Sequence, residues 1–223
     1  MHRPRFAPWR RLPAALALAA GLATALAGPV EDALTEAIGH YGRGEVEAAR
    51  SAFEALARQG VPAADYNLAL MHLNGDLPGG AAEARRLMRR AAEAGFVTAM
   101  FGLGVLHEQG RLGAPDLPRA VAWYLRAAHA GSVDAQVAVA TAYYLGRGVP
   151  QDLASAAQWY REAARGGDVG AQYLIASMYE AGLGVDVDLR LARYWYEIAA
   201  RNGDEAAPGK VEELDRRLQG QLE

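Results

Sequence analysis

A period of 36 residues constrains this chain more than any other feature. Tryptophan recurs at this spacing at Trp123, Trp159 and Trp195. Three further sets of residues keep the same spacing: Gly110, Gly146 and Gly182; Gly131, Gly167 and Gly203; Asp116, Asp152 and Asp188. Four sets with one period indicate a tandem repeat, in which each copy is one supersecondary unit that buries its apolar face against its neighbours.

Each copy is predicted to be a pair of helices. In the first helix of the third copy, Leu103, Gly104 and His107 lie on one helical face, which is expected to pack against the second helix and the next repeat. The glycine at Gly110 ends this helix, and Asp116 caps the start of the second. Alanine is the most frequent residue and strand-forming residues are sparse, which favours an all-α fold. The alanines and Gly104 predict a close approach of the two helices.

The later copies carry a specific signature. The fourth copy contains Tyr143, Gly146 to Val149, Asp152, Ala156, Trp159-Tyr160, Ala163-Ala164 and Gly167. The fifth contains the equivalent Tyr179, Gly182 to Val185, Asp188, Ala192, Trp195-Tyr196, Ala199-Ala200 and Gly203. This pattern resembles the Sel-one-like repeat (SLR) family, a relative of the tetratricopeptide repeat proteins, over roughly residues 30–203. The resemblance implies an α/α superhelical solenoid of about five helix-turn-helix repeats.

The repeat boundaries divide the chain into an ordered series of segments. A degenerate first repeat is expected over residues 28–60, and four clearer repeats over 61–95, 96–131, 132–167 and 168–203. A C-terminal capping helix follows over 204–223, as an open array requires. In that helix, Val211, Leu214 and Leu218 are expected to pack on the array. The charged residues are expected to face away: Glu212, Glu213, Asp215, Arg216 and Arg217.

Residues 1–27 have the pattern of a cleaved secretory signal peptide. Arginines cluster before residue 12, residues 12–26 are apolar, and Ala25 to Ala27 form a cleavage signal. A retained membrane anchor is the alternative, although the apolar stretch is shorter than the ~20 residues a span needs. Cleavage predicts a periplasmic or secreted protein without stable membrane insertion. It also removes arginines but no acid, so a chain with formal net charge -3 becomes more acidic and is not expected to bind nucleic acid.

One stripe of the first helices is predicted to bind a partner. In the SLR family the first helix of each repeat lines the concave side, and the stripe offset from the core positions is unusually apolar and aromatic for a solvated face. Rigid exposed aromatics are common anchors of protein interfaces. The alternative is that tight curvature buries these residues against neighbouring first helices. The predicted groove residues are Tyr66, Leu70, Phe101, Val105, Glu108, Val137, Tyr144, Tyr173 and Glu180, with the two glutamates expected to select basic groups.

The sequence gives no pattern for catalysis, a metal or a cofactor. It has no cysteine, and it has no serine nucleophile elbow or P-loop. His72 and His107 occupy a position that tyrosine fills in other copies, so they are interpreted as polar-tipped aromatics beneath a loop. Asp186 and Asp188 begin like a calcium loop but lack the later ligands, and an N-cap at Asp188 is favoured.

The resemblance implies a function in assembling protein complexes, often at the bacterial envelope. The chain is therefore expected to be an exported adaptor that binds a peptide or helical segment in its concave groove. Two alternatives stay open: a periplasmic enzyme that acts on cell-wall material, and an architectural subunit of an envelope assembly. Identity of the partner is not encoded in these patterns, because one scaffold hosts many functions.

Overall fold

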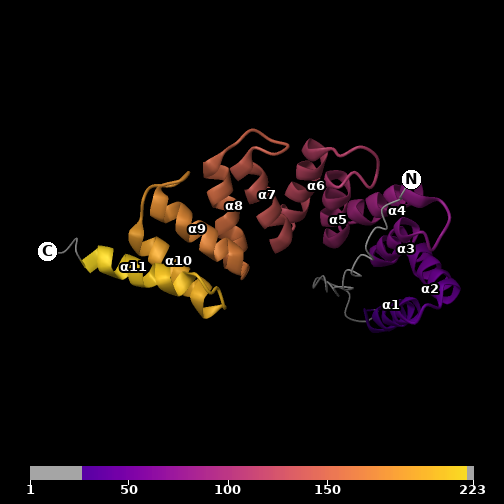
Figure 1. Cartoon of the computed structure of the whole chain (residues 1–223). Helices are drawn as coiled ribbons and strands as arrows, with labels where there is room; N and C mark the ends of the chain where they lie inside the picture. Colours follow the sequence, from indigo (N-terminus) through magenta and orange to yellow (C-terminus); the bar gives the residue numbers. More distant parts are fainter. Residues whose placement is uncertain (1–26, 220–223) are drawn as a thin grey trace, which may run out of the picture. The chain divides into compact units, whose positions relative to one another are not determined.

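The computed structural model describes residues 27–219, which form eleven helices and no strands (Figure 1). The predicted signal segment lies outside these residues except for Ala27. The all-α fold predicted from the sequence is confirmed. The helices are α1 (Ala27–Gly42), α2 (Val46–Arg58), α3 (Pro62–Asn74), α4 (Gly80–Glu93), α5 (Val97–Glu108), α6 (Leu117–His129), α7 (Val133–Leu145), α8 (Leu153–Arg165), α9 (Val169–Ala181), α10 (Leu189–Arg201) and α11 (Ala207–Gln219).

The chain divides into two compact units, one ending at Gly60 and one beginning at Val61. In the first unit, α1 and α2 pack against each other as a helical hairpin. Ala37 of α1 and Ala49, Phe53 and Leu56 of α2 are buried in it. This hairpin is therefore a small helix pair with an aliphatic and aromatic interior.

The second unit is an array in which each helix packs against the next in the chain, from α3 to α11 (Figure 1). The pairs α3/α4, α5/α6, α7/α8 and α9/α10 make the most extensive contacts, and α11 covers α10. Each pair corresponds to one copy of the repeat. The core therefore continues from one helix pair to the next along the array, as expected for a solenoid.

Aspartates begin the second helices of three repeats, as the spacing predicts. The side chain of Asp116 accepts a hydrogen bond from the backbone N–H of Arg119 at 2.9 Å. Asp152 accepts from the N–H groups of Ala154 and Ser155, and Asp188 accepts from that of Leu191. These bonds satisfy backbone donors that the first turn of a helix leaves free. The interpretation of Asp188 as an N-cap is confirmed.

Small residues allow the helices to approach closely. The alanine at the same position of four first helices is fully buried in each case: Ala64, Ala99, Ala135 and Ala171. Gly104 of α5 lies directly under the Tyr124 ring of α6, since a Cβ atom on Gly104 would meet that ring at 2.4 Å. The predicted reason for a glycine here is confirmed: a side chain would push the two helices apart.

The Trp-Tyr pairs of the second helices lie mainly in the core. Trp123 and Tyr124 are buried, and so are Tyr160, Trp195 and Tyr196. Trp159 differs, because it is half-buried and its ring meets the ring of His129 at a centroid distance of 5.0 Å. The pairs therefore serve packing between helices rather than forming a row of exposed aromatics.

Helix α11 caps the array with charges as well as apolar residues. Leu214 is fully buried, as predicted. The expectation that all the charged residues face away is wrong for two of them. Asp215 forms an ion pair with Arg193 of α10, and the Arg217 guanidinium lies 2.8 Å from a carboxylate oxygen of Glu180 on α9. The sequence pattern missed these pairs because the partners are far along the chain and helix period alone does not identify them.

None of the helices in residues 27–219 is long and apolar enough to cross a bilayer.

Two alanine substitutions in α5 test the close helix approach. We expect Gly104→Ala to lower the free energy of unfolding by about 1–3 kcal/mol, because the new methyl group overpacks against the Tyr124 ring. Gly102→Ala is the matched control, since its Cβ would meet Tyr66 and Met88 at ordinary distances of 3.5 and 3.6 Å. Better helix propensity should make this control neutral or stabilising by ~0.5–1 kcal/mol. Urea unfolding followed by circular dichroism measures both, and equal effects would contradict the packing argument.

Candidate binding surface

The nine predicted groove residues lie on the first helices of the repeats in the second unit. We call this set the helix-A face, and every residue in it is half-buried. Its members are Tyr66 and Leu70 on α3, Phe101, Val105 and Glu108 on α5, Val137 and Tyr144 on α7, and Tyr173 and Glu180 on α9. Spacings of four and seven residues bring the members on each helix to one side of it.

Each aromatic ring of the helix-A face packs on a second aromatic ring. Phe101 lies against Tyr124 at a centroid distance of 5.4 Å, and Tyr173 lies against Tyr196 at 5.0 Å. The same pairing joins Tyr144 to Tyr160 at 6.5 Å, and Tyr66 to Phe96 at 5.5 Å. In three repeats the supporting ring therefore comes from the second helix of the same pair. Such contacts hold the half-buried rings in fixed orientations.

The supporting tyrosines direct their hydroxyl groups toward the helix-A face. Tyr124 donates a hydrogen bond to Glu108 at 2.7 Å, and Tyr196 donates to Glu180 at 2.9 Å. Burial, followed by the adjacent carboxylate, raises the pKa of both phenols, so they remain protonated donors. In the repeat between them, Tyr144 occupies the glutamate position and Tyr160 bonds Thr141 at 2.9 Å instead. A buried hydroxyl thus finds a partner in all three repeats.

The two glutamates of the helix-A face differ in how fully the chain already satisfies them. Glu180 has a 14% exposed side chain and accepts hydrogen bonds from Lys210 at 3.3 Å and Arg217 at 2.8 Å, besides Tyr196. Glu108 has a 39% exposed side chain and faces Arg147 at 3.5 Å. Glu180 is therefore part of the junction with α11, whereas Glu108 stays accessible.

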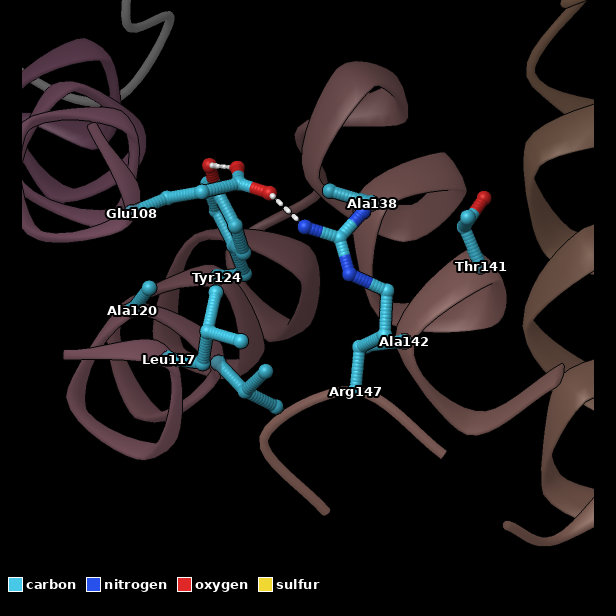
Figure 2. A pocket seen from close by; sticks show the side chains of 9 residues that line it. Glu108, Leu117, Ala120, Tyr124, Ala138, Thr141, Ala142 and Arg147 are labelled. Atoms are coloured by element: carbon cyan, nitrogen blue, oxygen red, sulfur yellow. Dashed lines mark hydrogen bonds and ion pairs between the residues drawn. The ribbon is translucent and has the colours of Figure 1, made fainter. Parts of the chain in front are cut away.

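A pocket of about 230 Å³ lies where α5, α6 and α7 meet, and Figure 2 shows it from close by. Glu108, Tyr124 and Arg147 stand together in this view, with the hydrogen bond and the ion pair drawn between them. The remaining lining is Leu117, Ala120, Val121, Ala138, Thr141 and Ala142. The pocket thus combines an apolar surface with one carboxylate, one guanidinium and two hydroxyl groups.

Sequence reasoning identified Glu108 in this pocket but missed Arg147 and the role of Tyr124. Arg147 lies in the loop after α7, in a position that is Arg111 in the preceding copy and Leu183 in the following one. The ring of Tyr124 is buried in the core, whereas its hydroxyl reaches the pocket and bonds Glu108. The available signal was the alternation of Glu108, Tyr144 and Glu180 at one repeat position, each sixteen residues before a tyrosine.

Within residues 27–219, no group of three or more histidine, aspartate or glutamate side chains is placed to hold a metal ion. His107 is buried, and burial, followed by the charge of Arg119, lowers its pKa.

Comparisons with known proteins match this architecture. Four consecutive segments match the family model of the Sel1 repeat: residues 62–96, 97–132, 133–168 and 169–204. A Sel1 repeat protein from Oxalobacter formigenes is 35% identical, with a TM-score of 0.68 over 74% of this chain and 49% of that protein. The protective antigen c5321 of uropathogenic Escherichia coli, which has an SLR fold, is 28% identical, with a TM-score of 0.72 over 87% of this chain and 46% of that protein.

This chain spans about half the length of both solved relatives. No curated protein matches it. The similarity therefore concerns the repeat and how its copies stack, and it does not identify a partner for this chain.

Replacing each glutamate of the helix-A face by glutamine tests its place in the array. We expect Glu180→Gln to lower the free energy of unfolding by about 1–3 kcal/mol, because Lys210 and Arg217 lose a poorly exposed counter-charge. Glu108→Gln should change it by less than ~1 kcal/mol, since both members of its ion pair are well exposed. Hydrogen exchange should accelerate in α11 for the first variant only. Similar losses in both variants would show that the junction with α11 does not depend on Glu180.

Proposed function

Because the chain belongs to the Sel1 repeat family, we propose that it is a non-enzymatic scaffold that captures a segment of a partner protein on its helix-A face. Proteins of this family are generally protein–protein interaction scaffolds. The proposal for this chain rests on one observation. A pocket with apolar and charged walls opens beside Glu108, within a row of half-buried aromatic residues.

The aromatic residues of the helix-A face have the properties of interface anchors. Phe101, Tyr144 and Tyr173 each rest on a tyrosine of the second helix, which limits their freedom before a partner arrives. Rigid aromatic rings offer a large contact area at a small cost in conformational entropy. Their spacing over successive repeats suits an extended or helical segment that lies across several first helices.

The pocket between α5, α6 and α7 is the proposed centre of this surface. Its walls at Leu117, Val121 and Ala138 suit one apolar side chain of the partner. The side chain of Glu108 is partly exposed, Arg147 is exposed, and the two lie 3.5 Å apart, so each can exchange this contact for a polar group of the bound segment. Selection of basic groups therefore rests on Glu108 in this proposal, since Glu180 already accepts three hydrogen bonds within the chain.

Filling the pocket tests the function directly. We expect Ala138→Leu to reduce recovery of the bound partner from cell-envelope extract by about tenfold, because the larger side chain occupies the space for the partner's side chain. The bait is residues 28–223, and bound proteins are quantified by mass spectrometry. Ala122→Leu adds the same volume at an exposed position of α6 outside the pocket lining, and it should leave recovery unchanged.

Two outcomes of this experiment would count against the proposal. Equal recovery with native and Ala138→Leu baits would place the binding surface elsewhere. Absence of any partner with the native bait would remove the reason to regard the chain as a scaffold. The double variant Phe101→Ala, Tyr144→Ala should also lose the partner, and its unfolding must be measured in parallel because both rings pack on buried tyrosines.

Export to the periplasm or beyond is part of the proposal. The basic start, the apolar residues 12–26 and the small residues at Ala25 and Ala27 support it. Expression of the full chain in a Gram-negative host should give a periplasmic product whose first residue is Gly28, as read by intact-mass measurement. A product that retains residues 1–27 in the membrane fraction would indicate an anchor instead, and one in the cytoplasm would contradict export.

A further inference from the structure

Helix α4 presents an unusually basic face to solvent. Four arginines lie on it at positions spaced by one and four residues, and all four are exposed: Arg85, Arg86, Arg89 and Arg90. We call these residues the arginine face. Together with Ala82 and Glu93 they line a surface depression of about 460 Å³. None of them belongs to the helix-A face, which is formed by the first helices of the repeats.

Contacts within the chain neutralise only half of this charge. Arg90 donates to the buried Asp65 of α3 at 2.6 Å, and Arg86 donates to Glu83 at 2.6 Å. Arg85 donates to a backbone carbonyl, that of Leu112. Ion pairs on α4 join Arg86 to Glu83 and Arg90 to Asp65, whereas Arg89 forms no ion pair with a carboxylate of residues 27–219. Two guanidinium groups therefore lack a carboxylate partner.

The arrangement is unfavourable for the helix taken alone. Arg85 and Arg89 are four residues apart, and Arg86 and Arg90 repeat that spacing. Like charges at this spacing lie on the same side of a helix and destabilise it. Packing of the array does not require such charges, because the equivalent positions of α6 include Val121, Ala122 and Leu125. An anionic group that bridges Arg85 and Arg89 would relieve the repulsion.

Basic charge continues from α4 onto the next second helix. Helix α6 carries Arg119 and Arg126 and contains no aspartate or glutamate. Arg119 of α6 and Arg85 and Arg89 of α4 all act to lower the pKa of His107, which is buried on α5 between these two helices in the chain. Arg119 meets Asp116 only at 3.5 Å, and Arg126 lies over the Trp123 ring. Exposed arginines therefore occur on the second helices of two successive repeats.

We propose that the arginine face binds an acidic peptide segment of a partner protein, at a site separate from the helix-A face. Arginines four residues apart on a helix are separated by about 6 Å along its axis. Alternate side chains of an extended peptide are separated by ~6.6 Å, so glutamates at every second position match this spacing. The planar guanidinium group also binds carboxylates through two parallel hydrogen bonds.

The dimensions of the arginine face favour a peptide over a nucleic acid. Helix α4 has 14 residues and is therefore ~20 Å long. A DNA duplex carries one charge per ~1.7 Å and would extend beyond this face. The chain as a whole has a formal net charge of -3, so its other surfaces would not attract the rest of a long polyanion. A short acidic segment matches both the length and the local charge.

A synthetic peptide tests this site without knowledge of the natural partner. The probe is a fluorescein-labelled twelve-residue peptide with glutamate at alternate positions, and its binding to residues 28–223 is followed by fluorescence anisotropy. We expect saturable binding to the native chain and at least a tenfold higher Kd for Arg85→Gln, Arg89→Gln. The single variant Arg89→Gln, which breaks no ion pair among the described residues, should raise Kd about threefold.

A matched variant separates this site from general charge attraction. Arg190→Gln, Arg216→Gln removes the same charge from exposed positions of α10 and α11, and it should leave Kd within twofold of native. Equal losses in both double variants, or no binding of the glutamate peptide to the native chain, would overturn the proposal. Arginine-dependent binding of a single-stranded oligonucleotide of equal charge that is tighter than binding of the peptide would overturn it in favour of a nucleic acid. Ala138→Leu should bind the peptide as the native chain does, so failure here is distinguishable from failure of the helix-A face.

Discussion

The close approach of the two helices in each pair is the constraint on which the array depends. Ala64, Ala99, Ala135 and Ala171 are fully buried at the same position of four first helices, and Gly104 lies against the Tyr124 ring. A larger residue at these positions would separate the helices and expose the apolar surface between them. The Tyr124 ring that packs on Gly104 also carries the hydroxyl that donates a hydrogen bond to Glu108 of the helix-A face. Packing of the core and chemistry of the helix-A face therefore have one cause.

Polar contacts between successive repeats then fix their register. The arginine three positions after Glu108 or after Tyr144, its equivalent in the next repeat, extends back to the repeat before its own. Arg147 meets Glu108 in this way, and Arg111 donates to the carbonyl of Leu73. At the end of the array, Lys210 and Arg217 of α11 take over this function for Glu180. The contact that joins two successive repeats differs from one junction to the next, so these contacts disfavour stacking of the repeats in a different order.

The sequence predicted the features that repeat and missed those that differ between copies. Period and spacing identified the helix pairs, the caps at Asp116 and Asp152, and the small residue at Gly104, because each of these depends on local sequence. The same method placed Arg217 and Asp215 of α11 in solvent, although both form ion pairs across the array. It also left Arg147 unassigned, since its partner lies 39 residues earlier on another helix. Long side chains of unlike charge can reach several positions, and a helical period does not choose between them.

The charge on α4 is best understood by comparing the position of Asp65 across the repeats. Met100, Gln136 and Gln172 occupy this position in the later copies, so the fold does not require a carboxylate there. A buried carboxylate is costly unless it is paired, and Arg90 supplies the pair. Arg90 satisfies Asp65 and Glu83 pairs with Arg86, whereas Arg85 and Arg89 form no ion pair with a carboxylate of residues 27–219. Since their mutual repulsion opposes the helix that carries them, their presence is explained by a ligand outside the chain better than by folding.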